Sequence, residues 1–172
     1  APRAGSLTVV HADAVSVVAV ALRTPAGAPR ALVANLPYAV AATVVLRFFE
    51  ELPSLERAVV MVQSEVADRM AAVPGTKAYG AYTVKLGLLA RPVGRFAVPR
   101  SCFLPPPRVD SAVIRLDRGP QAGTPTLVAA AARAADAAFT QRRKTLRNSF
   151  AAGLGITVSE ASAILAEVGI DG

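Results

Sequence analysis

The sequence predicts an α/β protein: a mainly parallel sheet followed by a small all-helical C-terminal domain. Short apolar runs of strand length alternate with helical patterns through the first two thirds of the chain. A Pro- and Gly-rich segment at 119–125 then leads into a tail whose patterns are helical only. Strand–helix alternation favours a parallel sheet, and a Pro- and Gly-rich segment indicates a boundary. We therefore expect a first domain at 1–118, a linker at 119–125 and a helical domain at 126–172.

Length and composition limit the classes of protein that the chain can represent. With 172 residues, 53% of them hydrophobic, it can bury a core for one domain and an appendage. The single cysteine, Cys102, excludes an intramolecular disulfide, and one cysteine with one histidine argues against a transition-metal site. No apolar run reaches the length of a membrane span, and no signal peptide is evident. We therefore expect a cytoplasmic protein that binds neither a membrane nor a metal ion.

Basic residues are concentrated in two stretches. The net charge is +7, and residues 71–118 hold eight basic side chains against two acidic ones. Four of the five basic residues after position 118 lie within Arg142–Arg147. Such local excess indicates a polyanionic partner, and nucleic acid is the usual one. The alternative is charge that serves solubility, or the arginine preference of a GC-rich genome.

The expected strands follow from short apolar runs. The run at 57–63 is apolar in its middle, so we expect it to be buried on both faces. The run at 111–116 alternates, with Ala112, Ile114 and Leu116 on one face. In chain order, the expected strands are 7–10, 31–34, 57–63, 94–98 and 111–116.

The expected helices are bounded by caps and breakers. Pro53 ends the first, and Thr157–Glu160 is a capping box whose helix should end at Gly169. The stretch at 82–89 fits a helix or a strand, and we favour a helix. A helix beginning near Thr140 would place the basic stretch in its first turns, a favourable position for binding phosphate. In chain order, the expected helices are 39–51, 64–72, 82–89, 127–139, the one from Thr140, and 157–169.

Asn35-Leu36-Pro37-Tyr38 is the candidate catalytic turn. It follows the strand at 31–34, and ligands of open α/β sheets bind at the carboxyl ends of strands. The Asn35 side-chain oxygen and the Leu36 carbonyl can each accept one hydrogen of a nucleobase amine, while Pro37 fixes the turn and offers no competing N–H. The nitrogen lone pair would then face an electrophilic methyl group, and Tyr38 would stack on the base. The alternative is an ordinary turn in which Asn and Pro are only turn formers.

Two further side chains are placed where strands end. Asp13 follows the first expected strand and can accept a hydrogen bond from the adenine amine of a cofactor, although capping a turn is the commoner use of such an aspartate. Phe103 lies in a proline-stiffened loop at 99–110, which can hold an aromatic ring in one pose. Its alternative role is that of a core residue.

Several of these stretches together resemble a known family. They are 33–38, 61–69 (Met-Val-Gln-Ser-Glu-Val-Ala-Asp-Arg), 74–80 (Pro-Gly-Thr-Lys-Ala-Tyr-Gly), 103–111 (Phe-Leu-Pro-Pro-Pro-Arg-Val-Asp-Ser) and 139–149. In this order they resemble the small-subunit ribosomal RNA adenine dimethyltransferases along most of the chain. The resemblance implies a Rossmann-like class I methyltransferase sheet, incomplete at the N-terminus. It also implies methyl transfer from S-adenosylmethionine to the exocyclic amines of two adjacent adenosines near the 3′ end of small-subunit rRNA, in ribosome biogenesis.

The resemblance also implies roles for individual residues. Asn35, Leu36, Pro37 and Tyr38 would form the catalytic turn, with Phe103 as the second aromatic that stacks on the base. Asp13 would contact the adenine of the cofactor, and Asn35 would lie beside the cofactor as well. A monomer would bind pre-ribosomal RNA through basic side chains of the 99–110 loop and of the helical domain. These are Arg100, Arg108, Arg142, Arg143, Lys144 and Arg147.

The chain also departs from the family pattern. Ala39 and Ala42 stand where the family carries Asn and Ser or Thr, so we expect a weaker cap on the helix after the turn. No Gly-x-Gly-x-Gly loop occurs in the 172 residues, although this loop usually cradles part of the cofactor. We therefore expect an internal piece of a longer enzyme that is inactive alone.

Two alternatives stay open. One is a large-subunit rRNA methyltransferase of the erythromycin-resistance type, which usually has Ile where this chain has Leu36. The other is a non-catalytic RNA-binding or ribosome-assembly factor of the same fold. The intact Asn35–Tyr38 turn argues against the second, since a protein that only binds RNA does not need it.

Overall fold

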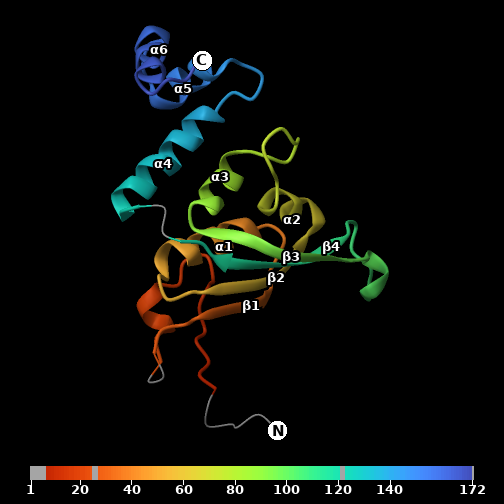
Figure 1. Cartoon of the computed structure of the whole chain (residues 1–172). Helices are drawn as coiled ribbons and strands as arrows, with labels where there is room; N and C mark the ends of the chain where they lie inside the picture. The colour runs from red at the N-terminus through yellow and green to blue at the C-terminus, as the bar shows by residue number, and fades with distance from the viewer. Residues whose placement is uncertain (1–6, 25–26, 121–122, 172) are drawn as a thin grey trace. The chain divides into compact units, whose positions relative to one another are not determined.

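The computed structural model describes residues 7–24, 27–120 and 123–171 (Figure 1). The chain forms two compact units, one of residues 1–68 with 90–118 and the other of residues 69–89 with 119–172. Residues 69–89 thus group with the C-terminal helices, although we expected them in the first domain. The division of function between domains, and the linker at 119–125, stay predictions.

In the described residues, the first unit is built on a sheet of four strands in the order β1-β2-β4-β3. These are β1 (Ala31–Asn35), β2 (Arg57–Gln63), β3 (Ala90–Val98) and β4 (Ser111–Arg118). β1 pairs in parallel with β2, whereas β4 runs antiparallel to both β2 and β3, so three of the four strands point the same way. Gln63 and Val98 both pair with Ser111, and Asn35 pairs with Met61. The carboxyl ends of β1, β2 and β3 therefore lie at the same end of the sheet.

The core of this unit lies between the helix α1 (Ala41–Glu51) and one face of the sheet (Figure 1). α1 buries Ala41, Val44, Val45 and Phe49. Alternate residues of β2 and β4 are fully buried on the sheet, namely Ala58, Val60, Val62, Ala112, Ile114 and Leu116. This is the two-residue period expected for a sheet with one covered face.

The other face of the sheet is more open than the sequence suggested. Val59 and Met61 are only half-buried, so the expectation that β2 is buried on both faces is wrong. On the neighbouring strands Val33 is 78% exposed and Phe96 62% exposed. An apolar run alone does not distinguish one covered face from two, because the second depends on what packs there.

Arg118 closes the C-terminal end of α1. Its guanidinium donates hydrogen bonds to the carbonyls of Leu55, Phe49 and Leu52 at 2.6, 2.9 and 2.8 Å. It also lies 5.3 Å from the centre of the Phe49 ring. Partial burial lowers the pKa of Arg118 from its ordinary value. The side chain thus satisfies carbonyls that a helix end leaves without partners.

The expected strand at Leu7–Val10 is wrong. These residues belong to no helix or strand, and the side chains of Leu7 and Val9 are 76% and 81% exposed. A strand requires a neighbour for its backbone hydrogen bonds, and the sheet order of the described residues provides none for this segment. The described part of the first unit also contains two short 3₁₀ helices. These are η2 (Ala19–Leu22) and η3 (Arg100–Cys102).

Helices make up the second unit. They are α3 (Ala81–Gly87), α4 (Pro125–Ala138), α5 (Leu146–Leu154) and α6 (Val158–Glu167), while α2 (Ser64–Met70) crosses the division between the units. The helical interpretation of 82–89 and the capping box at Thr157–Glu160 are both confirmed. Hydrogen bonds from the backbone N–H and the hydroxyl of Thr157 lower the pKa of Glu160. Among the described residues no single helix is long and apolar enough to cross a membrane, although the bent pair α5 and α6 together has the length and composition.

The helix expected from Thr140 begins later. Residues 141–143 form a turn, 144 a bend, and α5 starts at Leu146, so only Arg147 of the basic stretch lies in a helix. The buried Ser149 explains the delay, because its hydroxyl oxygen accepts from the Gln141 backbone N–H at 2.9 Å. The same hydroxyl lies 2.8 Å from the Ala138 carbonyl. A side-chain contact thus replaces the helical hydrogen bonds of this segment.

Candidate active site

A pocket of about 390 Å³ lies where β1 ends. It is lined by the turn after β1 and by the loop between β3 and β4, with the residues Asn35, Leu36, Pro37, Tyr38, Phe103, Pro105 and Pro107. The five residues that the sequence analysis assigned to catalysis therefore line one pocket. They come from segments nearly 70 positions apart, which the pairing of β2 with β4 brings together.

The Asn35–Tyr38 turn is fixed by its backbone and by one buried side chain. The Leu36 N–H donates to the Met61 carbonyl at 3.2 Å, and the Leu36 side chain is only 7% exposed. The Pro37 carbonyl accepts from the N–H groups of Val40 and Ala41, both at 3.1 Å. No hydrogen bond to the Leu36 carbonyl or the Asn35 side chain is found within the described parts of the chain. Two acceptors on consecutive residues are thus available to a ligand.

The helix after this turn has no side-chain cap. Val40 occupies the N-cap position of α1 and provides no side-chain hydrogen bond. A valine cannot cap a helix as Ser, Thr, Asp or Asn would. The turn is therefore positioned by β1 and by the buried Leu36 rather than by a helix cap.

Tyr38 is held by a residue that the sequence analysis missed. Its hydroxyl lies 2.8 Å from the Ser111 hydroxyl, and Ser111 is fully buried at the start of β4. The Ser111 carbonyl in turn accepts from the Ser64 hydroxyl at 3.2 Å. Ser111 is 73 positions from Tyr38, so no local pattern indicates the contact. The pair fixes one end of the Tyr38 ring.

Hydrogen bonds to Asp110 fix the base of the loop that carries Phe103. The Asp110 carboxylate accepts from the Arg100 backbone N–H at 2.9 Å, and the Asp110 carbonyl accepts from the Ser64 N–H at 3.0 Å. Within the loop, the Phe103 N–H donates to the Arg100 carbonyl at 3.2 Å. Phe103 is half-buried, whereas the neighbouring Leu104 is 99% exposed. The loop thus fixes the Phe103 backbone at the pocket.

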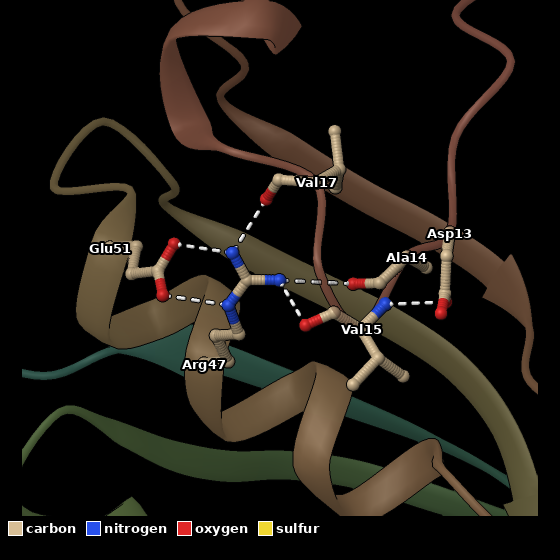
Figure 2. Close-up of polar contacts among 6 residues, drawn as sticks. All are labelled: Asp13, Ala14, Val15, Val17, Arg47 and Glu51. Carbon is tan, nitrogen blue, oxygen red and sulfur yellow. Dashed lines mark hydrogen bonds and ion pairs between the residues drawn. The ribbon is translucent and has the colours of Figure 1, made fainter.

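Asp13 does not line this pocket. One of its carboxylate oxygens accepts from the Val15 N–H at 2.9 Å, the turn-capping geometry that the sequence analysis kept as the alternative. Arg47 of α1 holds the same turn through the carbonyls of Val15 and, at 2.6 Å, Val17 (Figure 2). Glu51 pairs with Arg47 and fixes its guanidinium at 2.7 and 2.9 Å.

The contacts of Asp13 and Asn35 with a cofactor stay predictions, and they would form only part of a cofactor site. Within the described chain the second carboxylate oxygen of Asp13 has no partner and can accept from an adenine amine. The glycine loop that usually cradles the rest of such a cofactor does not occur in the sequence. Arg47 is the residue that positions Asp13, and sequence reasoning missed it because its partners are backbone carbonyls 30 or more positions away.

The six basic candidates lie outside this pocket. Arg100 and Arg108 are exposed in the β3–β4 loop, near Phe103 in sequence, but line no part of it. Arg142 and Lys144 line a different pocket, within the second unit, and Arg143 and Arg147 are exposed outside both. The structure therefore separates these side chains into three groups.

Comparison with known proteins shows the family of the chain. Residues 3–170 match the family model described as ribosomal RNA adenine dimethylase. The chain belongs to this family. It is similar to proteins named ribosomal RNA small subunit methyltransferase A. The protein from Streptomyces griseus is 45% identical over 95% of this chain and 55% of its own length. The protein from Rhodococcus opacus is 46% identical over 97% of this chain and 56% of its own length.

Solved structures agree on the fold. A dimethyladenosine transferase from Plasmodium falciparum has a TM-score of 0.62 and 25% identity, over 88% of this chain and 55% of that chain. The 23S rRNA methyltransferase ErmE has a TM-score of 0.60 and 24% identity, over 95% of this chain and 63% of that chain, and shows the fold alone. The expected Rossmann-like fold is thus confirmed. The chain spans a little over half the length of the curated relatives it matches.

Proposed function

We propose that the whole protein transfers methyl groups from S-adenosylmethionine to the exocyclic amines of two adjacent adenosines near the 3′ end of small-subunit rRNA. The observation that carries the proposal is the pair of available acceptors, the Asn35 side chain and the Leu36 carbonyl, in a pocket that Tyr38 and Phe103 also line. Relatives 45% and 46% identical are named small-subunit rRNA methyltransferases.

Binding of the base comes first in this account. The target adenine must leave its stack, at a cost on the order of a few kcal/mol. Stacking on Tyr38 and Phe103 offsets that cost, since an aromatic side chain contributes roughly 1–3 kcal/mol per base. Ser111 and Asp110 act indirectly, because one holds the Tyr38 hydroxyl and the other closes the loop of Phe103.

Orientation of the amine comes second. The Asn35 side-chain oxygen and the Leu36 carbonyl each accept one hydrogen of the adenine amine, which turns the nitrogen lone pair away from the ring. S-adenosylmethionine supplies the electrophilic methyl group, and Asp13 and Asn35 are the residues of this chain that would contact it. The amine becomes cationic as it is methylated, so it loses its proton to water readily and needs no strong base from the protein.

Binding of the RNA backbone is assigned to the basic side chains. Arg100 and Arg108 would hold phosphates beside the first pocket, and Arg142, Arg143, Lys144 and Arg147 would hold others on the helical unit. We propose a monomer that acts on the pre-ribosomal small subunit in the cytoplasm.

The test is methyl incorporation by the whole protein into defined RNAs. The expected result is transfer of up to four methyl groups to small-subunit RNA, and none after both adjacent adenosines are replaced by guanosine. Transfer to large-subunit RNA instead would favour the alternative of the erythromycin-resistance type. RNA binding without any transfer would favour the non-catalytic factor.

A further inference from the structure

A second pocket, of about 440 Å³, lies entirely within the helical unit. It is lined by the loop at 74–79 and by the turn between α4 and α5, and its side chains include Tyr79, Phe139, Gln141, Arg142, Lys144 and Leu146. Its volume lies within the range of small-ligand pockets. The first pocket shares none of these residues.

The walls of the second pocket are fixed by several hydrogen bonds. Ser149, which is 1% exposed, holds the turn through the Gln141 N–H and the Ala138 carbonyl. The Arg142 guanidinium donates to the Lys77 carbonyl at 2.7 Å and so joins the turn to the 74–79 loop. The pocket is therefore a built feature of the unit rather than a gap between loose segments.

The apolar part of the pocket is aromatic. The rings of Tyr79 and Phe139 are 5.8 Å apart with an interplanar angle of 65°. Both residues are half-buried and line the pocket. In an edge-to-face pair at least one ring face is not covered by the other ring. Such a face can stack on a flat ligand, and nucleobases of every kind have a π-face to offer.

The polar part of the pocket has unused hydrogen-bonding capacity. In the described parts of the chain, the Gln141 amide, the Tyr79 hydroxyl and the Lys144 ammonium have no hydrogen-bond partner. An amide has both donors and an acceptor, as the edge of a nucleobase does, whereas an ammonium suits phosphate. The unit as a whole holds eight basic residues against four acidic ones. Its charge therefore favours a polyanion.

We propose that this second pocket binds one unpaired nucleotide of the RNA substrate, apart from the adenine that is methylated. The base stacks on the Tyr79–Phe139 pair, the Gln141 amide hydrogen-bonds to the edge of the base, and Lys144 with Arg142 holds its phosphate. A phosphate alone would not need the aromatic wall, and a base in a duplex has its edge and faces occupied. The inference rests on the proposed action on RNA and adds a second point of recognition to it.

The experiment compares two single-stranded RNA 12-mers, one with mixed bases and one fully abasic, which carry the same phosphates. Their affinities for the whole protein are measured by fluorescence anisotropy at several salt concentrations. Since the first pocket also takes a base, the assignment rests on how variants of the second pocket change the preference for the base-bearing RNA. The variants are Gln141→Ala, Tyr79→Leu, Tyr79→Phe and Lys144→Gln, and Arg133→Gln on α4 is a matched control, because Arg133 is exposed and lines neither pocket.

The expected result has three parts. Tyr79→Leu weakens binding of base-bearing RNA roughly tenfold, whereas Tyr79→Phe does not, because stacking needs a ring. Gln141→Ala weakens binding of the same RNA but leaves that of abasic RNA and the salt dependence unchanged. Lys144→Gln weakens binding of both RNAs and flattens log K against log salt by about 0.7–0.9. Arg133→Gln leaves the preference unchanged.

Equal losses for base-bearing and abasic RNA in every variant would overturn the proposal and leave only a basic surface. If Tyr79→Leu fails to fold by circular dichroism, Gln141→Ala still decides, because its side chain is exposed and makes no hydrogen bond among the described residues. Methyl incorporation is read separately. If no variant changes the preference for base-bearing RNA while the wild-type protein transfers methyl groups, only the second pocket is refuted. Absence of transfer by the wild-type protein refutes the proposed function.

Discussion

The Asn35–Tyr38 turn and the Gln141–Lys144 turn are both short segments just before a helix, but they are held in different ways. The first continues a strand, and its position follows from the register of β1 with β2 and from the buried Leu36. The second lies in a unit whose described elements are helices, and it depends on the hydroxyl of Ser149 and on the Arg142–Lys77 contact. The site at the carboxyl ends of the strands is therefore fixed mainly by backbone pairing, whereas the site in the helical unit is fixed by side chains.

The largest expected effect on the second turn comes from Gly153→Ala. A Cβ at Gly153 would lie 2.4 Å from the Ala137 Cα, so α4 and α5 would have to separate. Overpacking of this kind costs roughly 1–3 kcal/mol. Hydrogen exchange should show faster opening of α4 and α5 and unchanged protection of β2 and β4. Gly87→Ala is the matched control, since nothing lies within 4 Å of its added Cβ. Equal destabilisation of both units would contradict the comparison.

The next effect concerns the first pocket. Phe103→Ala should weaken capture of the flipped adenine by roughly 1–3 kcal/mol, while Phe103→Tyr should keep it. The measurement is binding of RNA with 2-aminopurine at the target position, whose fluorescence reports stacking. If the Ala and Tyr variants behave alike, Phe103 is a packing residue rather than a platform for the base.

A smaller effect is expected from the hydrogen bond between Ser111 and Tyr38. Ser111→Ala removes the hydrogen bond to the Tyr38 hydroxyl, which contributes about 0.5–1.5 kcal/mol. Tyr38→Phe should cost about as much, and the double variant little more, because both remove the same hydrogen bond. We expect KM for RNA to rise more than kcat falls, since Ser111 acts through the position of the ring. Fully additive losses in the double variant would show that the two residues act independently.

The smallest effect is that of the exposed charges outside both pockets. Arg143→Gln with Arg147→Gln should weaken binding of RNA of any sequence. It should also flatten log K against log salt by up to about 0.7–0.9 for each phosphate that the protein no longer neutralises. The base preference of either pocket should not change, because neither residue lines one. An unchanged salt slope would leave these two arginines as surface charge.

The parts of the site that could be predicted from sequence are the local ones. Asn35–Tyr38 follows a short apolar run and contains a proline, which indicates a turn at a strand end, and the prolines around Phe103 indicate a stiff loop. The missed residues act over long separations: Ser111 on Tyr38, and Arg47 on the turn of Asp13. Polar contacts between distant segments leave no periodicity in the sequence.

The errors in the fold have the same origin. Leu7–Val10 has the composition of a strand, but strand formation requires a partner that the run itself does not specify. The stretch after Thr140 has helix-forming residues, yet Ser149 holds the Gln141 backbone outside the helix. In the first case the lack of a partner, and in the second a side-chain contact, outweighed local propensity.

The most direct test of the central claim is Asn35→Ala in the whole protein, measured for both kcat and RNA affinity. Asn35 contacts the reacting amine in our account, so kcat should fall about a hundredfold or more while the RNA dissociation constant stays nearly unchanged. Asn148→Ala, which changes the chain's other asparagine and lies outside the first pocket, is the control and should keep its turnover. Near-normal turnover of Asn35→Ala would contradict the assignment of this turn as the site of methyl transfer.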